Sequence, residues 1–128
     1  MFEAEAEGLR ELATANAIRV PAVFDCGIDN GAAFIAIERL HFERATTAVE
    51  AMFGEQLANL HRHSKVQHGW HRDNTHGPTP QHNPWTDDWI DFFREYRLRF
   101  QLDLAARNGY TGELQSLGDR LEGRLGDL

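Results

Sequence analysis

One short segment of the sequence contains residue types that could take part in phosphate chemistry. His71-Arg72-Asp73 matches the tripeptide of a phosphoryl-transfer catalytic loop, in which the aspartate accepts a proton from the attacking hydroxyl. In such a loop an asparagine stands five residues after the aspartate and binds magnesium, whereas this sequence has Pro78 at that position. We therefore do not interpret Asp73 as a catalytic base, and we assign no catalytic residue within this chain.

The histidines of the chain raise the question of a metal site. His61 and His63, or His68 and His71, are close in sequence, but neither pair has a third ligand at a recognisable spacing. On a helix, His61 and His63 would point to different faces. We therefore predict no metal site.

A loop of about twenty residues contains Asp73 and several of the histidines. Residues 64–85 include two glycines and three prolines, and they follow neither the strand period of two nor the helical period of 3.6. Loops of this length inside compact domains are usually functional or disordered. Asn74 and Gln81 could hold the loop backbone by hydrogen bonds, so a purely structural role for its polar side chains remains open.

The residues before this loop predict two helices and a β-hairpin. Their signals are apolar residues at three- and four-residue steps, a tight turn that tolerates positive φ, and a threonine that can cap a helix. The expected elements are a helix over residues 2–15, strands over residues 22–27 and 32–40 around Asp29-Asn30-Gly31, and a helix from Thr46 or Thr47 to His63.

The residues after the loop predict two further helices. Thr86 can cap the first, which Asn108-Gly109 ends, and its apolar residues cover more than half of its circumference, so we expect burial on several sides. The second begins at Thr111 and continues to the end of the chain. The fold class is therefore α+β and mostly helical. The expected hairpin has only two strands, and two strands seldom form a stable sheet without further partners.

The composition fits a folded, soluble chain and argues against two classes of partner. Apolar residues make up 41% and charged residues 26% of the chain. A formal net charge of -7 argues against a nucleic-acid partner, and no apolar run approaches the roughly 18 residues of a membrane helix. The single cysteine, Cys26, excludes an intrachain disulfide and favours a reducing compartment, so we expect the cytoplasm.

Several stretches resemble the fructosamine kinase (ketosamine 3-kinase) family in order and spacing, over nearly the whole chain. They are FEAEAEGLRELA, IRVPAVFDCG, FIAIERL, GEQLANLHR and DNTHGPTPQHNPWTDDWIDFFREYRLRFQLDLA. The last stretch is the most specific, because the residues that match the family, from Asp73 through Trp85 to Leu102, follow no simple packing period. The sequence departs from the family's usual pattern at His68, where phenylalanine is usual, and at His76, where an aliphatic residue is usual.

This resemblance implies a partial protein-kinase-like fold made of a helix, a β-hairpin, a hinge and then helices of the C-terminal lobe. Residues 1–40 would be a remnant of the N-terminal lobe ending at the hinge, and residues 41–128 the first part of the C-terminal lobe, with a substrate-side loop at residues 64–85. By the same resemblance, Glu5 would orient a lysine that grips the nucleotide phosphates. Backbone groups of Glu38, Arg39 and Leu40 would bind adenine.

The resemblance also implies that the loop helps to form a site for the sugar and amine of the substrate. The residues implied are Asp73, Asn74, Thr79, Gln81, Asn83 and Trp85. This interpretation and the purely structural one both remain open.

Several parts of a phosphotransferase have no counterpart in the sequence. There is no phosphate-covering glycine-rich turn, and the one lysine, Lys65, follows Glu5 where the phosphate lysine should precede it. We therefore expect an internal fragment, inactive alone, of an ATP- and Mg²⁺-dependent kinase. By resemblance that kinase phosphorylates the sugar 3-hydroxyl of ketosamines, as small molecules or on glycated proteins, in protein deglycation.

Two alternatives stay open. The chain could be a non-catalytic module that associates with itself through an exposed sheet edge. It could also belong to an aminoglycoside or choline kinase-like phosphotransferase, although that class would not need the series Thr79-Pro80-Gln81, Asn83 and Trp85.

Overall fold

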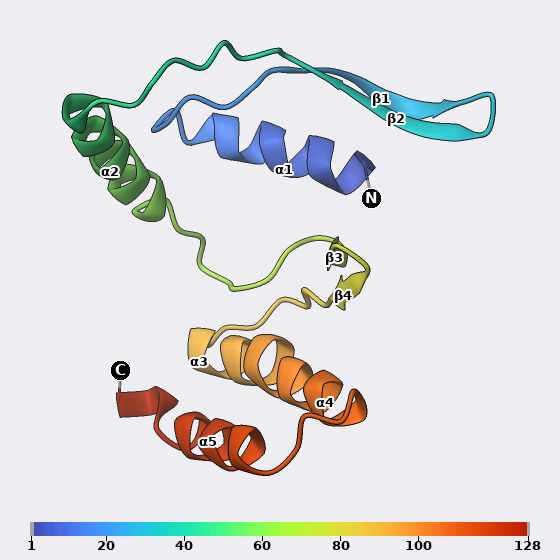
Figure 1. Ribbon diagram of the computed structural model, residues 1–128, viewed down its shortest axis with the longest axis vertical. Helices are drawn as coiled ribbons and strands as arrows, with labels where there is room; N and C mark the ends of the chain where they lie inside the picture. The colour runs from blue at the N-terminus through green and yellow to red at the C-terminus, as the bar shows by residue number, and fades with distance from the viewer. Residues whose placement is uncertain (1, 128) are drawn as a thin grey trace. The chain divides into compact units, whose positions relative to one another are not determined.

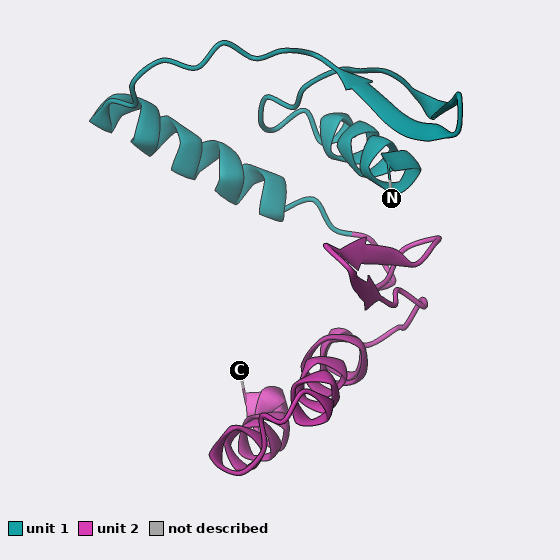
Figure 2. Cartoon of the chain, turned by 45° about the vertical axis from the view of Figure 1, so that its right-hand side comes forward, with its two compact units in different colours: residues 1–64 teal, residues 65–128 magenta. Residues whose placement is uncertain are grey.

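The computed structural model describes residues 2–127, and the chain forms two compact units (Figure 2). Unit 1 contains residues 1–64 and unit 2 contains residues 65–128. The division expected from the sequence, with residues 1–40 and 41–128 in different lobes, concerns the larger fold and stays a prediction. The elements are α-helical and β-stranded with helices predominating, which confirms the expected fold class (Figure 1).

Unit 1 begins with a helix packed on a β-hairpin. Helix α1 (Phe2–Thr14) buries Ala4 and Ala6, and it contacts strands β1 (Val23–Asp29) and β2 (Ala32–Ile37). The strands pair antiparallel around Asn30 and Gly31, whose φ values are 47° and 80°. Positive φ at both central residues is what a tight two-residue hairpin turn requires, so the predicted helix and hairpin are confirmed. The strand bounds differ from those expected, because β1 continues to Asp29 and β2 ends at Ile37 and not at residue 40.

The second helix of unit 1 is capped as expected. Helix α2 (Thr47–His61) has Thr46 as its N-cap, and the Thr46 hydroxyl oxygen accepts a hydrogen bond from the Val49 N–H at 3.3 Å. None of the residues of α2 is buried, and Met52 and Phe53 are each about half exposed. The helix is thus defined by its local sequence more than by packing within the described residues.

The loop of unit 2 is more regular than the sequence indicated. It contains a small antiparallel hairpin of β3 (Asn74–His76) and β4 (Thr79–Gln81), with Gly77 at a φ of 58° in the turn. Strands of three residues are too short to show an alternating pattern, which explains why periodicity missed them.

The long helix of unit 2 differs from the expected one in its start and its winding. It consists of α3 (Trp89–Phe93), a π-helical segment η1 (Arg94–Arg99) and α4 (Phe100–Arg107). Asp88, not Thr86, is the N-cap, because its carboxylate accepts the Asp91 N–H at 2.9 Å. Thr86 instead forms an isolated β-bridge, in which its backbone N–H and carbonyl pair with those of His68.

This helix is also less buried than expected. Leu102 is its one buried residue among those described, and Trp89 is 48% exposed. Leu102 packs against Gly118 of helix α5 (Glu113–Glu122), which begins two residues after the predicted Thr111 and is followed by the short 3₁₀-helix η2 (Leu125–Asp127). Among the described residues, no helix is long and apolar enough to cross a membrane.

Candidate functional site

Asn83 is the residue around which the loop of unit 2 is organised. It is the one buried polar residue among those described, with 5% of its surface exposed. Its backbone N–H donates to Asp73 Oδ1 at 2.9 Å, and its carbonyl accepts the Trp70 N–H at 2.9 Å. Its side-chain Nδ2 donates to the Arg72 carbonyl at 3.2 Å, and its Oδ1 accepts from Arg97. All four kinds of polar group on Asn83 are therefore paired, as a buried amide requires.

Arg97 connects the loop to the π-helical segment η1. Its Nη2 donates to Asn83 Oδ1 and its Nη1 donates to the His82 carbonyl at 2.8 Å. The guanidinium also lies over the ring of Phe92, with its central carbon 4.5 Å from the ring centroid. Burial lowers the pKa of Arg97, because an apolar environment disfavours the charged form.

Asp73 presents a carboxylate that is held in place and still reaches solvent. Its Oδ2 lies 2.8 Å from His82 Nδ1, and its side chain is 60% exposed. The hydrogen bond from the Asn83 backbone, and then the one from His82, lower the pKa of Asp73 against a smaller opposing effect of burial. Asp73 is therefore ionised at neutral pH.

The two ends of the loop meet at His68 and Thr86. Each backbone N–H donates to the carbonyl of the other residue at 2.8 Å. Beside this pair, Gly69 has a φ of 140°, and a Cβ added there would lie 2.4 Å from the Pro84 carbonyl oxygen. Only glycine allows this close approach of two backbone segments.

A cavity of about 510 Å³ lies beside this network. Its wall combines aromatic rings with the polar groups already described, and Trp85 remains 42% exposed there. The lining residues are Trp70, His71, Arg72, Asp73, His82, Asn83, Pro84, Trp85 and Tyr96. Aromatic surface next to an ionised carboxylate is suited to a small ligand that has both an apolar face and a cationic or hydroxyl group.

Half of the loop residues implied by the resemblance lie at this cavity. Asp73, Asn83 and Trp85 line it, whereas the remaining three belong to the β3–β4 hairpin and are not part of its wall. Asn74 pairs with Gln81 in the hairpin register, and the Asn74 Oδ1 accepts the Thr75 N–H at 2.8 Å.

Sequence reasoning about the site did not single out Arg97, Trp70, His82 or Tyr96. Arg97 is 14 residues from Asn83, and no helical or strand spacing connects the two positions. Only the resemblance offered a signal for Arg97, because that residue belongs to the same motif series.

The residues implied in nucleotide binding lie in unit 1. Glu5 is exposed on α1, and its side chain makes no hydrogen bond or ion pair with the residues that the structure describes. Arg39 and Leu40 follow β2 in an irregular segment that continues to Thr46.

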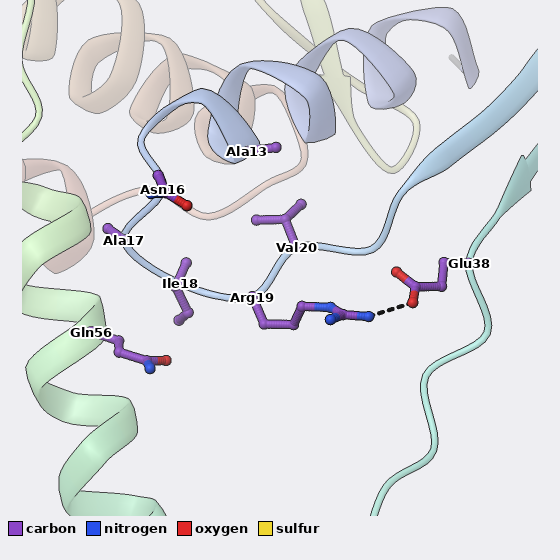
Figure 3. A pocket seen from close by; sticks show the side chains of 8 residues that line it. All are labelled: Ala13, Asn16, Ala17, Ile18, Arg19, Val20, Glu38 and Gln56. Atoms are coloured by element: carbon purple, nitrogen blue, oxygen red, sulfur yellow. Dashed lines mark hydrogen bonds and ion pairs between the residues drawn. The ribbon is translucent and has the colours of Figure 1, made fainter.

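Glu38, directly after β2, lines a second cavity of about 500 Å³ (Figure 3). Its carboxylate pairs with Arg19 through Oε1 and accepts the Ala22 N–H at 3.2 Å through Oε2. The other lining residues are Ala13, Asn16, Ala17, Ile18, Val20 and Gln56. The Glu38 side chain thus has a defined structural role, in addition to its backbone groups.

A magnesium ion would need oxygen ligands gathered at one point. Within residues 2–127, no three histidine, cysteine, aspartate or glutamate side chains are arranged so that they could hold a metal ion. The described residues therefore do not fit a complete magnesium site, and we assign no step to a metal ion bound by them.

Comparison with known proteins adds the family context. A protein from Synechocystis named as a probable ketoamine kinase is 46% identical over 108 residues, covering 84% of this chain and 37% of the relative. A chloroplastic protein-ribulosamine 3-kinase of Oryza sativa is 38% identical over 124 residues, covering 94% of this chain and 36% of the relative. The chain thus spans little more than a third of the length of these relatives.

A solved structure shows the same fold. The crystal structure of a protein from Haemophilus somnus assigned as a fructosamine-3-kinase matches with a TM-score of 0.85 and 31% identity, over 98% of this chain and 43% of that protein. This match confirms the expected partial kinase-like fold. The fructosamine kinase family model matches residues 1–127, and the chain therefore belongs to the fructosamine kinase family.

Proposed function

We propose that this chain is part of an ATP- and Mg²⁺-dependent ketosamine 3-kinase that phosphorylates the sugar 3-hydroxyl of glycated amines, and that it is inactive alone. The observation that carries the proposal is the loop of unit 2. Its family residues Asp73 and Asn83 are held by hydrogen bonds and line one cavity together with Trp85. Such preorganisation lowers the entropic cost of binding a small substrate.

The chemistry of the cavity fits a ketosamine. The substrate carries an amine that is cationic when protonated and a sugar with hydroxyl groups, and Asp73 offers an ionised carboxylate. Both Asp73 oxygens already accept one hydrogen bond, but each carboxylate oxygen has two lone pairs and can accept another. The exposed part of Trp85, whose ring centroid lies 5.8 Å from the Lys65 Nζ, supplies apolar surface for the sugar ring.

The proposed nucleotide contacts lie in unit 1. Glu5 would pair with a lysine supplied by another part of the kinase, which agrees with its exposed position on α1. Backbone groups of Glu38, Arg39 and Leu40 would bind the adenine of ATP. The lone Cys26 leads us to propose a reducing compartment, and specifically the cytoplasm, for this activity.

The first experiment determines the intact mass of the natural protein from its source cells, with an antibody against residues 73–85. A species more than twice as long is expected, because the chain covers 37% of the Synechocystis relative and 43% of the Haemophilus somnus protein. That protein is then incubated with ATP, magnesium and a fructosamine. It should form the 3-phosphate, whereas an aminoglycoside or choline should not be phosphorylated.

The 128-residue chain is assayed in parallel. It should form no more product than a control without enzyme, because phosphate-binding and catalytic residues are missing from its sequence. Product above that control would contradict the proposal that the chain is inactive alone. A source-cell protein of full length without kinase activity on ketosamines would contradict the proposed function itself.

The second candidate function is self-association. The β1–β2 sheet has only two strands among the described residues, and its residues Phe24 and Ile28 are 70% and 76% exposed. Free strand edges can pair with the same edge of another copy. Size-exclusion chromatography with light scattering should give a dimer or a larger species if this function is correct, and a monomer would exclude it.

A further inference from the structure

The segment proposed to bind adenine begins at Glu38, which makes three polar contacts, two with Ala22 and one with Arg19. The Glu38 N–H donates to the Ala22 carbonyl at 2.8 Å, which extends the strand pairing one step beyond Val23 and Ile37. The Glu38 Oε2 accepts the Ala22 N–H at 3.2 Å. Glu38 therefore binds both backbone groups of Ala22, one through its main chain and one through its carboxylate.

Arg19 completes this arrangement. Its Nη2 donates to Glu38 Oε1, the oxygen that Ala22 does not use (Figure 3). The Glu38 side chain is 30% exposed and the Arg19 side chain is 67% exposed, so the carboxylate is the more enclosed partner. Charge-assisted hydrogen bonds of this kind are stronger than those between neutral groups. Without Arg19, the carboxylate would turn toward water and the Ala22 N–H would lose its acceptor.

The contacts of Glu38 matter for the residues that follow it. Residues 38–46 are neither helical nor stranded, so the backbone direction of Arg39 and Leu40 depends on how Glu38 is held. We propose, on the basis of the kinase function proposed above, that Arg19 is a positioning residue. Through Glu38 it fixes the backbone of residues 38–40 in the orientation that binds adenine.

The test compares Arg19→Ala, Arg19→Lys and the control Arg10→Ala in the kinase as its source cells produce it. Arg10 is exposed on α1 and is not among the residues that line the cavity beside Arg19 and Glu38. The KM values for ATP, for GTP and for a fructosamine are measured together with kcat. GTP is included because a displaced hinge backbone should distinguish adenine from guanine less well.

Arg19→Ala should raise the KM for ATP about two- to fivefold, the effect expected from losing a partly exposed ion pair. The preference for ATP over GTP should fall by a similar factor, while the KM for the fructosamine stays unchanged. Arg19→Lys should recover part of the loss, because it keeps the charge but not the planar guanidinium. Arg10→Ala should behave as the wild type.

A second measurement follows the contact directly. Hydrogen exchange at the Ala22 amide should become faster in Arg19→Ala than in Arg10→Ala. Glu38→Gln keeps the shape of the side chain and removes its charge, so it should have a similar effect. The double variant Arg19→Ala/Glu38→Gln should be little worse than either single variant, because both remove the same pair.

The outcomes separate this inference from the function on which it rests. A wild-type protein that phosphorylates no ketosamine would overturn both. An active wild type whose Arg19→Ala variant retains its KM for ATP and its Ala22 protection would overturn the role of Arg19 alone. Equal increases in the KM values for ATP and fructosamine would also overturn it, because they would indicate a general loss of structure.

Discussion

Arg97 donates a hydrogen bond to the buried Oδ1 of Asn83, and this contact joins the π-helical segment to the loop that contains the candidate site. Because the same guanidinium binds the His82 carbonyl, it fixes two consecutive residues of the loop. Asp73 depends on these residues in turn, since it accepts hydrogen bonds from the Asn83 backbone and the His82 ring. Arg97 therefore sets the position of the exposed Asp73 carboxylate indirectly, through His82 and Asn83.

Replacement of Asn83 by alanine should destabilise unit 2 by about 2–3 kcal/mol. It removes the acceptor of Arg97 and the donor to the Arg72 carbonyl, and partly buried groups without partners are costly. Urea unfolding should show the change as a lower midpoint. The control Asn74→Ala removes only a hydrogen bond to the adjacent Thr75 N–H and should cost less than 1 kcal/mol, by the same measure. Equal effects of the two variants would contradict the central position of Asn83.

Gly69→Ala should open the base of the loop. The new Cβ would lie 2.4 Å from the Pro84 carbonyl oxygen, and a φ of 140° is unfavourable for alanine, so a cost of about 2 kcal/mol or more is expected. Gly77→Ala is the matched variant, because Gly77 also has positive φ but has open space around it, and it should cost about 1 kcal/mol. The fluorescence of the neighbouring tryptophans during unfolding reports the difference, and a Gly69→Ala protein as stable as Gly77→Ala would show that the close approach is unimportant.

Gly118→Ala and Gly54→Ala should change stability in opposite directions. An added Cβ at Gly118 would meet the Cδ1 and Cδ2 atoms of the buried Leu102 at 2.4 and 2.6 Å, so crowding should cost about 1–2 kcal/mol. Gly54 lies inside α2 with nothing near its Cβ position, and alanine there should add about 0.5–1 kcal/mol of stability. Thermal unfolding measures both. A neutral or stabilising Gly118→Ala would mean that Leu102 has room to move.

The contribution of Asp73 to stability should depend on pH. Its pKa is lower in the folded chain than its ordinary value of about 3.9, so the unfolded state binds the proton more tightly. The ionised carboxylate therefore contributes stability that is complete at pH values well above about 4 and is lost as the pH falls through the lowered pKa.

Urea unfolding of the wild type and of Asp73→Asn between about pH 7 and pH 3 tests this prediction. The wild type should be the more stable protein at pH 7, and the difference should shrink as the solution becomes acidic. Asp103→Asn, on the exposed surface of α4, controls for the change in net charge. A difference that grows toward low pH would contradict the lowered pKa of Asp73.

Local signals were sufficient for most of unit 1. The three- and four-residue spacing of α1, the Asn30-Gly31 turn and the Thr46 cap each depend on a few neighbouring residues, and the structure confirms all three. In unit 2 the same reasoning placed the cap at Thr86. It could not detect that Thr86 is already paired with His68, a residue 18 positions away, so that Asp88 caps the helix.

The site was predictable only in part, because its contacts also join residues that are far apart in the sequence. Motif resemblance named Asp73, Asn83 and Trp85, which do line one cavity. The amide of Asn83 and the guanidinium of Arg97 meet because two segments pack together, and such a contact leaves no periodic trace in the sequence. The expected burial of the long helix was wrong because an apolar surface indicates that a partner is needed, but not that the partner lies within this part of the chain.

The π-helical turn at Arg94–Arg99 also has an evolutionary consequence. Such a turn accommodates one residue more than an α-helical turn and leaves the flanking helix intact on both sides. Deletion of a single residue there would restore an ordinary α-helix, and Leu102 would still face Gly118, because the wider turn had absorbed the extra residue. Insertion or deletion of one residue in the α-helical parts on either side would instead rotate everything after it by about 100°. Length changes among related sequences are therefore expected to occur within this turn more readily than in α3 or α4.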